Sequence, residues 1–139
     1  MPELRKDLFT DNWVIIAEGR DGRPMDYSQG TVPADDPADC PFEPGHESMT
    51  PPEIDAIRPS ASENADDWQV RVVPNKFSAL SPQEPRSVPV KHGLFQRMNG
   101  TGSHEVVIES PAHSRRLSDF SPEQVERVLR IFQRRLRTL

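Results

Sequence analysis

Proline is the residue that most restricts how this chain can fold. Most of its 15 prolines lie between Pro24 and Pro89, and only 34% of the 139 residues are hydrophobic. Proline donates no backbone hydrogen bond and its ring fixes one backbone dihedral angle, so a segment rich in proline is a poor helix or central strand. The sequence therefore predicts one modest core, with long proline-rich loops wrapped on a small scaffold.

Regular structure is expected where prolines are sparse. Three segments rich in β-branched and aromatic residues are predicted to be strands, namely Trp13–Ala17, Trp68–Val73 and His104–Glu109. In the second segment apolar residues alternate with the polar Gln69 and Arg71, which is the pattern of a half-buried strand.

A helix is predicted directly after these strands. Ser121 suits the N-cap, Pro122 the first helical position and Gln124 the reciprocal position of a capping box. Apolar residues then recur at helical spacing and are expected to pack as one stripe on the sheet: Val125, Val128, Leu129, Phe132 and Leu136. Strands followed by a helix on one face indicate an α+β fold, expected here as one domain over residues 1–139.

Charge and cysteine content exclude several classes of protein. A net charge of −5 and a pI of about 5.3 argue against a general nucleic-acid-binding protein, which would carry a basic surface. A single cysteine excludes an internal disulfide, and the N-terminus has no apolar run typical of a signal peptide or membrane span. We therefore expect a cytoplasmic protein that binds neither nucleic acid nor membrane.

Two distant segments carry residues suited to a ligand site. The third predicted strand leads to His113 at a strand-to-loop junction, a frequent location for a binding imidazole, and Cys40 and Glu43 lie three residues apart far upstream. This combination suggests a metal or phosphate site. The alternative is a small buried Cys40 with Glu43 as a solvated loop acid.

A second candidate site follows the first predicted strand. Arg20 and Arg23 lie on either side of Gly22, and the planar guanidinium group can donate to two phosphate oxygens at once. The spacing alone favours a solvated loop in which Asp21 neutralises one arginine over a phosphate site.

Several blocks of sequence together resemble the N-terminal half of the galactose-1-phosphate uridylyltransferase family, which belongs to the histidine-triad superfamily. The likeness spans essentially the whole chain and rests on the order of the blocks rather than on any one of them. The blocks are Glu3–Asp7, Thr10–Ile15, Arg20–Pro24, Cys40–Phe42, Val73–Leu80 and Ser110–His113.

The resemblance implies a histidine-triad-like half-domain, with an antiparallel sheet and a packed C-terminal helix, from a homodimeric enzyme. This family exchanges uridylyl groups between UDP-glucose or UDP-galactose and hexose 1-phosphates in galactose metabolism, through a nucleophilic histidine in a His-x-His-x-Gln motif. The motif does not occur in the 139 residues, so we expect the catalytic half to be absent and this chain alone to be inactive.

The resemblance also implies which residues bind ligands. Arg20 and Arg23 match contacts to the nucleotide-sugar phosphates, Asn75 and Phe77 match contacts to the nucleoside, and Val106 matches an apolar contact to the base. For a zinc ion, Cys40 and His113 match two family ligands, while Glu43 replaces the second cysteine of a Cys-x-x-Cys pair. A carboxylate can bind Zn²⁺, although it is a harder ligand than a thiolate.

Two alternative functions stay open at this point. Adenylyltransferases that phosphorolyse ADP-glucose share the Glu3–Asp7 start, the Glu109–Ser114 segment and the Leu117–Asp119 tripeptide. A non-catalytic module that binds a nucleotide sugar or a partner chain would use the same surface residues. The sequence does not distinguish a uridine from an adenine nucleotide.

Overall fold

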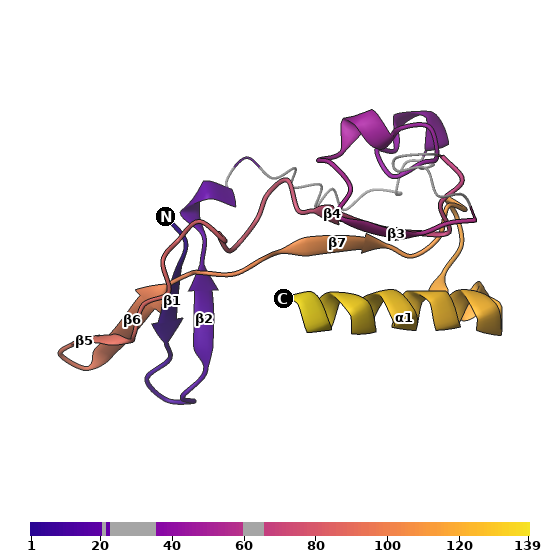
Figure 1. The fold of residues 1–139 in the computed structure, drawn as a ribbon. Helices are drawn as coiled ribbons and strands as arrows, with labels where there is room; N and C mark the ends of the chain where they lie inside the picture. The colour runs from indigo at the N-terminus through magenta and orange to yellow at the C-terminus, as the bar shows by residue number, and fades with distance from the viewer. Residues whose placement is uncertain (21, 23–35, 60–65) are drawn as a thin grey trace, which may run out of the picture. The chain divides into compact units, whose positions relative to one another are not determined.

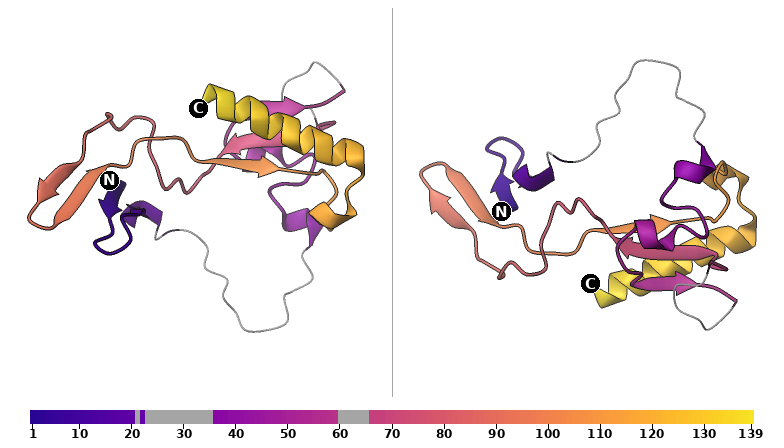
Figure 2. Two further views of the ribbon diagram at one scale, coloured as in Figure 1. Left: turned by 90° about the horizontal axis from the view of Figure 1, so that it is seen from below. Right: turned by 90° about the horizontal axis from the view of Figure 1, so that it is seen from above.

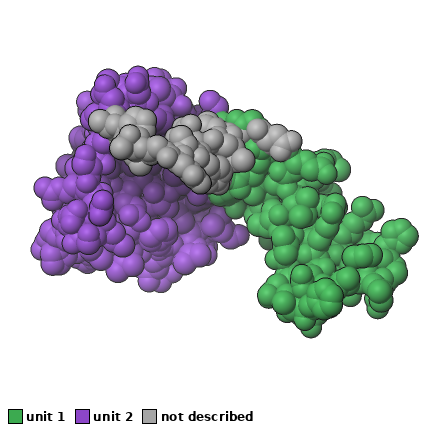
Figure 3. All heavy atoms as spheres, turned by 180° about the vertical axis from the view of Figure 1, so that it is seen from behind, with its two compact units in different colours: residues 1–26, 77–104 green, residues 27–76, 105–139 purple. Residues whose placement is uncertain are grey.

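The computed structural model describes residues 1–20, 22, 36–59 and 66–139, and the chain divides into two compact units (Figure 3). Unit 1 combines residues 1–26 with residues 77–104, and unit 2 combines residues 27–76 with residues 105–139. Each unit therefore assembles from two stretches that lie far apart in the sequence. Arg23 lies outside the described residues.

Unit 1 is a four-stranded antiparallel sheet with the strand order β2-β1-β6-β5 (Figure 1). The Asp7 carboxylate closes the link between β1 and β2, because its Oδ1 accepts hydrogen bonds from the backbone of Phe9 and Thr10 at 2.9 and 2.8 Å. The strands are β1 (Glu3–Lys6), β2 (Trp13–Ile16), β5 (Val90–His92) and β6 (Phe95–Asn99), and a 3₁₀ turn, η1 (Glu18–Arg20), follows β2.

Unit 2 is a three-stranded antiparallel sheet with an α-helix on one face (Figure 2). Its strand order is β3-β4-β7, and the helix α1 packs on β3 and β4. The elements are β3 (Asp55–Ile57), β4 (Val70–Pro74), β7 (Glu105–Ile108) and α1 (Pro122–Thr138), with 3₁₀ turns η2 (Pro37–Asp39), η3 (Glu47–Met49) and η4 (Leu117–Asp119). The α+β fold with a C-terminal helix on an antiparallel sheet is confirmed.

The central strand β4 is buried on both faces. Val70 and Val72 pack against Val128 and Ile131 of α1, while Val73 packs on the opposite side with Trp68 and Ile108. The prediction that β4 is half-buried is wrong at Arg71, whose side chain is only 1% exposed. Arg71 instead donates to Glu53 Oε2 at 3.2 Å and to Thr50 Oγ1 at 3.0 Å, so the 50–53 segment covers this face of the sheet.

The start of α1 agrees with the prediction in part. Ser121 is the N-cap, with its Oγ accepting from the Gln124 backbone at 3.4 Å, and Pro122 is the first helical residue. The predicted capping-box role of Gln124 is wrong, because its side-chain amide donates to the carbonyls of Gln69 and Glu109 at 2.8 and 2.6 Å. Gln124 thus fixes the helix to segments flanking β4 and β7.

The buried face of α1 differs from the predicted stripe. Val128 is buried as expected, but the other buried residue is Ile131, which the prediction omitted. Leu129, Phe132 and Leu136 are exposed, because the helix presents the Val128–Ile131 side to the sheet. Two arginines on this helix add bidentate ion pairs that hold it to the strands, Arg134 with Asp55 and Arg135 with Glu105.

Four short strands were not predicted from the sequence, namely β1, β3, β5 and β6. β1 has four residues, β3 and β5 have three each, and β6 is a polar-rich strand between β1 and β5, so none shows a strong apolar alternation. The predicted strands Trp13–Ala17, Trp68–Val73 and His104–Glu109 correspond to β2, β4 and β7. In the described part of the chain, no helix is long and apolar enough to cross a membrane.

The revised helix face leads to a stability prediction. Ile131→Ala should lower the free energy of unfolding by about 2–4 kcal/mol, because it removes most of a fully buried side chain and leaves a cavity in its place. Leu136→Ala, on the same helix but 75% exposed, should change it by less than about 0.5 kcal/mol. Urea unfolding followed by circular dichroism measures both. If the two variants lost equal unfolding free energy, the helix would instead pack on the sheet through the stripe predicted from the sequence.

Candidate metal centre

Cys40 and Glu43 lie on a loop of consecutive backbone turns. Asp36 caps η2 by accepting from the Ala38 backbone at 3.0 Å, and Cys40 ends this turn with its N–H donating to the Pro37 carbonyl. The Glu43 N–H then donates to the Cys40 carbonyl, which closes the next turn. These backbone bonds fix the conformation of the short segment of unit 2 that carries both side chains.

His113 lies next to Cys40 and Glu43 although it comes 70 positions after Glu43 in the sequence. It lies in the turn that follows β7, where Ser110 Oγ accepts from the Ala112 backbone at 3.0 Å. The Gln124 bond to the Glu109 carbonyl fixes the point at which this turn leaves the sheet. The imidazole is therefore carried by the β7–α1 connection.

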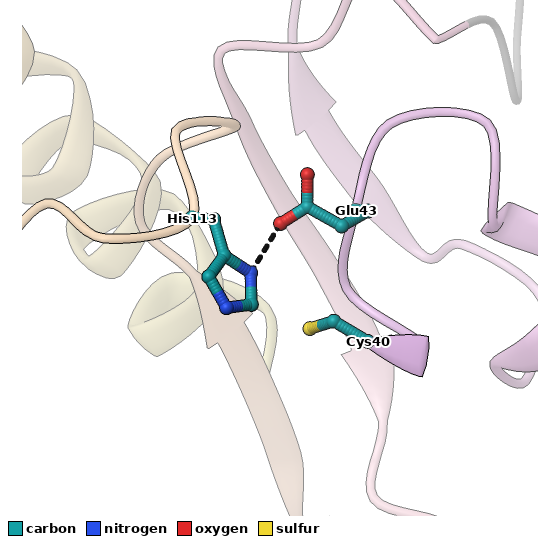
Figure 4. A group of neighbouring side chains, drawn as sticks. All are labelled: Cys40, Glu43 and His113. Atoms are coloured by element: carbon teal, nitrogen blue, oxygen red, sulfur yellow. Dashed lines mark hydrogen bonds and ion pairs between the residues drawn. The ribbon is translucent and has the colours of Figure 1, made fainter. Parts of the chain in front are cut away.

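Figure 4 shows the three side chains pointing toward one another. One ligand atom from each of Cys40, Glu43 and His113 lies within 4.8 Å of the others. His113 Nδ1 is 2.5 Å from Glu43 Oε1 although the residues are 70 positions apart, and both side chains are largely buried. Because a carboxylate oxygen accepts, Nδ1 carries the proton in this arrangement. The predicted approach of the three residues is confirmed, and their role as metal ligands stays a prediction.

The donor set fits a divalent transition metal. It offers one thiolate, one imidazole and one carboxylate, all of which bind Zn²⁺ at about 2.0–2.3 Å. Two nitrogen or oxygen ligands on a tetrahedral ion lie about 3.3 Å apart by the same geometry, so the His113–Glu43 pair would separate by about 1 Å to admit the ion. A hollow of about 340 Å³ adjoins the cluster and is lined by residues that include Ser110 and Arg115.

The segment that follows the loop carrying Cys40 and Glu43 is anchored to Trp68 and to Arg71 of β4. Just beyond the loop, Glu47 Oε1 accepts from the Trp68 indole at 2.8 Å, and further on Thr50 and Glu53 bond Arg71. Sequence reasoning missed these contacts. The available signals were a tryptophan, whose indole N–H needs a partner when buried, and an arginine inside a strand of valines.

The predicted nucleotide-sugar contacts are distributed over both units. Arg20 ends η1 in unit 1, and Phe77 lies in the same unit, both half-buried. Asn75 follows β4 in unit 2, and Val106 packs in that unit's core with Trp68, Val73 and Ile108. The part of the structure described here does not include Arg23, and the roles of all five in binding stay predictions.

The remaining histidines have local structural partners or exposed positions. His104 Nδ1 accepts from the Ala79 backbone at 3.0 Å in unit 1. His46 Nδ1 lies 2.7 Å from the Cys40 carbonyl, a contact that the sequence did not indicate. His92 is exposed at the end of β5.

Comparison with known proteins identifies the family. The protein-family model for the N-terminal domain of galactose-1-phosphate uridyl transferase matches residues 1–139. The chain belongs to this family. Members of the galactose-1-phosphate uridyl transferase family are nucleotidyltransferases, as the resemblance in the sequence implied, and this chain corresponds to their N-terminal domain.

Two curated relatives carry different activities in their names. An ADP-glucose phosphorylase from Arabidopsis thaliana is 38% identical over 138 residues, which cover 97% of this chain and 38% of the relative. A galactose-1-phosphate uridylyltransferase from Haemophilus influenzae is 29% identical over 143 residues, which cover 99% of this chain and 38% of the relative. The chain thus spans 38% of the length of either relative.

Solved structures of the family share the fold. The crystal structure of an ADP-glucose phosphorylase from Arabidopsis thaliana with bound ADP-glucose aligns with a TM-score of 0.55 at 33% identity, covering 99% of this chain and 38% of that one. A uridylyltransferase structure aligns with a TM-score of 0.59 at 26% identity, covering 98% of this chain and 34% of that one.

The anchoring of the ligand loop generates a pH prediction. Burial raises the pKa of Glu47, but the hydrogen bond from Trp68 and those from the backbone outweigh burial and hold the pKa below its ordinary value. The folded state therefore binds fewer protons than the unfolded state, so Glu47 contributes stability above about pH 4.3 that is lost as pH falls through the folded pKa.

Glu47→Gln should therefore destabilise the chain at pH 7 and approach the wild-type stability at pH 3, as measured by denaturant unfolding across this range. Glu126→Gln is the matched control, because its partner Arg130 is exposed and such a pair contributes little at either pH. A destabilisation by Glu47→Gln that does not change with pH would contradict the assigned pKa direction.

Proposed function

We propose that this chain is the nucleotide-sugar-binding N-terminal domain of a nucleotidyltransferase, and that Cys40, Glu43 and His113 hold a zinc ion in it. The observation that carries the proposal is the cluster itself, since two loops 70 positions apart bring a thiol, a carboxyl and an imidazole within 4.8 Å. Two of these residues match zinc ligands of the family, and the third replaces a ligand.

The zinc ion would have a structural role in this domain. Bound by Cys40 and Glu43 from one loop and His113 from the other, it would connect the β2–β3 segment to the β7–α1 connection. Both carboxylate and imidazole are largely buried, so the ion would also neutralise charge in a poorly hydrated place. Because binding requires a deprotonated thiol, zinc uptake should release protons.

The nucleotide sugar would be bound by residues at family positions. Arg20 and Arg23 would donate to the diphosphate, Asn75 and Phe77 would hold the nucleoside, and Val106 would contact the base. Arginine suits the diphosphate because its fork donates two parallel charged hydrogen bonds. The acceptor would be a hexose 1-phosphate or phosphate, in a protein that we propose to be homodimeric and cytoplasmic.

An adenine nucleotide is the specific alternative to a uridine nucleotide. The identity to the ADP-glucose phosphorylase, 38%, exceeds that to the galactose-1-phosphate uridylyltransferase, 29%, over almost the same part of this chain. The nearer relative in sequence therefore favours ADP-glucose as the ligand, with UDP-glucose as the second candidate.

Calorimetric titration of the full chain with ADP-glucose and UDP-glucose, with and without Zn²⁺, tests the proposal. We expect saturable binding of at least one nucleotide sugar, weakened by Arg20→Ala or Arg23→Ala by about 10- to 100-fold, the equivalent of charged hydrogen bonds worth about 1.5–3 kcal/mol. The control is Arg86→Ala, an exposed arginine of unit 1, which should bind like the wild type. No heat from either nucleotide sugar with folded protein would contradict the binding function.

A further inference from the structure

His46 ends the loop that carries two of the proposed zinc ligands. Its backbone N–H donates to the Glu43 carbonyl at 3.0 Å, and its own carbonyl accepts from the Met49 N–H at 2.9 Å. Gly45 precedes it with a φ of +91°, a left-handed conformation that glycine adopts readily. The chain therefore turns back at Gly45, which brings the His46 ring toward Cys40.

The His46 ring closes this loop through the Cys40 carbonyl. His46 Nδ1 lies 2.7 Å from that oxygen, whereas the backbone bond from Glu43 to the same oxygen is longer, at 3.3 Å. A carbonyl oxygen can only accept, so His46 Nδ1 carries the proton and donates it. The shorter of these two bonds to the Cys40 carbonyl is thus made by a side chain.

We propose that His46 is a positioning residue of the metal centre, which it serves by fixing the Cys40 backbone so that Sγ faces His113. This inference rests on the proposed zinc site. Groups that hydrogen-bond the segments around metal ligands set ligand orientation, and their loss typically weakens metal binding by about 10- to 100-fold. Among the described residues, the His46 ring and the Glu43 N–H both bond the Cys40 carbonyl. Removing the His46 donor therefore leaves this oxygen held by the longer 3.3 Å bond and loosens the Cys40 backbone.

A direct ligand role for His46 does not fit the geometry. Among the described residues, Cys40, Glu43 and His113 have ligand atoms close enough together to hold one ion, and His46 is not part of this group. Its Nδ1 is also occupied by the Cys40 carbonyl. His46 therefore acts on the ion through Cys40.

Three variants of the full chain separate positioning from general destabilisation. His46→Ala removes the donor, and His46→Asn keeps an amide N–H close to where Nδ1 lies. His92→Ala removes an exposed histidine of unit 1 and serves as the matched control. Circular dichroism confirms that each variant is folded before metal is added.

Zinc affinity is measured by competition with a chromophoric chelator, and Co²⁺ substitution gives a thiolate-to-metal absorption band that reports the Cys40 geometry. We expect His46→Ala to bind zinc about 10- to 100-fold more weakly and to lose intensity per bound Co²⁺ in that band. His46→Asn should recover most of both, and His92→Ala should match the wild type.

The outcomes distinguish this inference from the zinc proposal. Wild-type affinity and an unchanged Co²⁺ band in folded His46→Ala would overturn the positioning role while the zinc site stands. Loss of affinity that His46→Asn does not recover would also overturn it, since the donor would then be irrelevant. Failure of the wild type to bind zinc would overturn both proposals.

Discussion

The burial of β4 on both faces is the constraint on which unit 2 depends. One face of this strand packs on Val128 and Ile131 of α1, and the other lies against Trp68 and the segment that contains Thr50 and Glu53. A strand covered on both sides brings together residues from the middle and the end of the chain. The proposed metal ligands lie in loops that these two layers support.

Part of the cover on the second face is polar. Arg71 is almost fully buried, and Glu53 accepts from both Arg71 and Arg58, at 3.2 and 2.5 Å. Taking such charges out of water costs several kcal/mol, which good pairing only partly offsets. Arg71 Nη2 has no hydrogen-bond partner among the described residues, so pairing here is incomplete. The cluster fixes where the 47–53 segment lies, and through it the ligand loop.

Local sequence patterns predicted the parts of the fold that depend on local physics. The Ser121 cap and the β7 strand follow from capping chemistry and β-propensity, and both are present. The prediction of the buried helix face was wrong because the apolar residues of α1 form two adjacent stripes. Only packing decides that Ile131 faces the sheet while Leu136 does not. Gln124 and Arg71 were misjudged because their partners are contributed by segments distant in sequence.

The candidate site was predictable to a different degree. Residue chemistry and the family resemblance together indicated Cys40, Glu43 and His113, and the structure brings them into one cluster. The contact of His46 with the Cys40 carbonyl was not predictable, because it depends on the left-handed turn at Gly45.

X-ray absorption at the zinc edge of the zinc-loaded chain tests the central claim most directly. We expect one sulfur at about 2.3 Å together with nitrogen and oxygen ligands at about 2.0–2.2 Å, and loss of the sulfur shell in Cys40→Ser. A wild-type spectrum with only nitrogen and oxygen ligands, unchanged by Cys40→Ser, would contradict it.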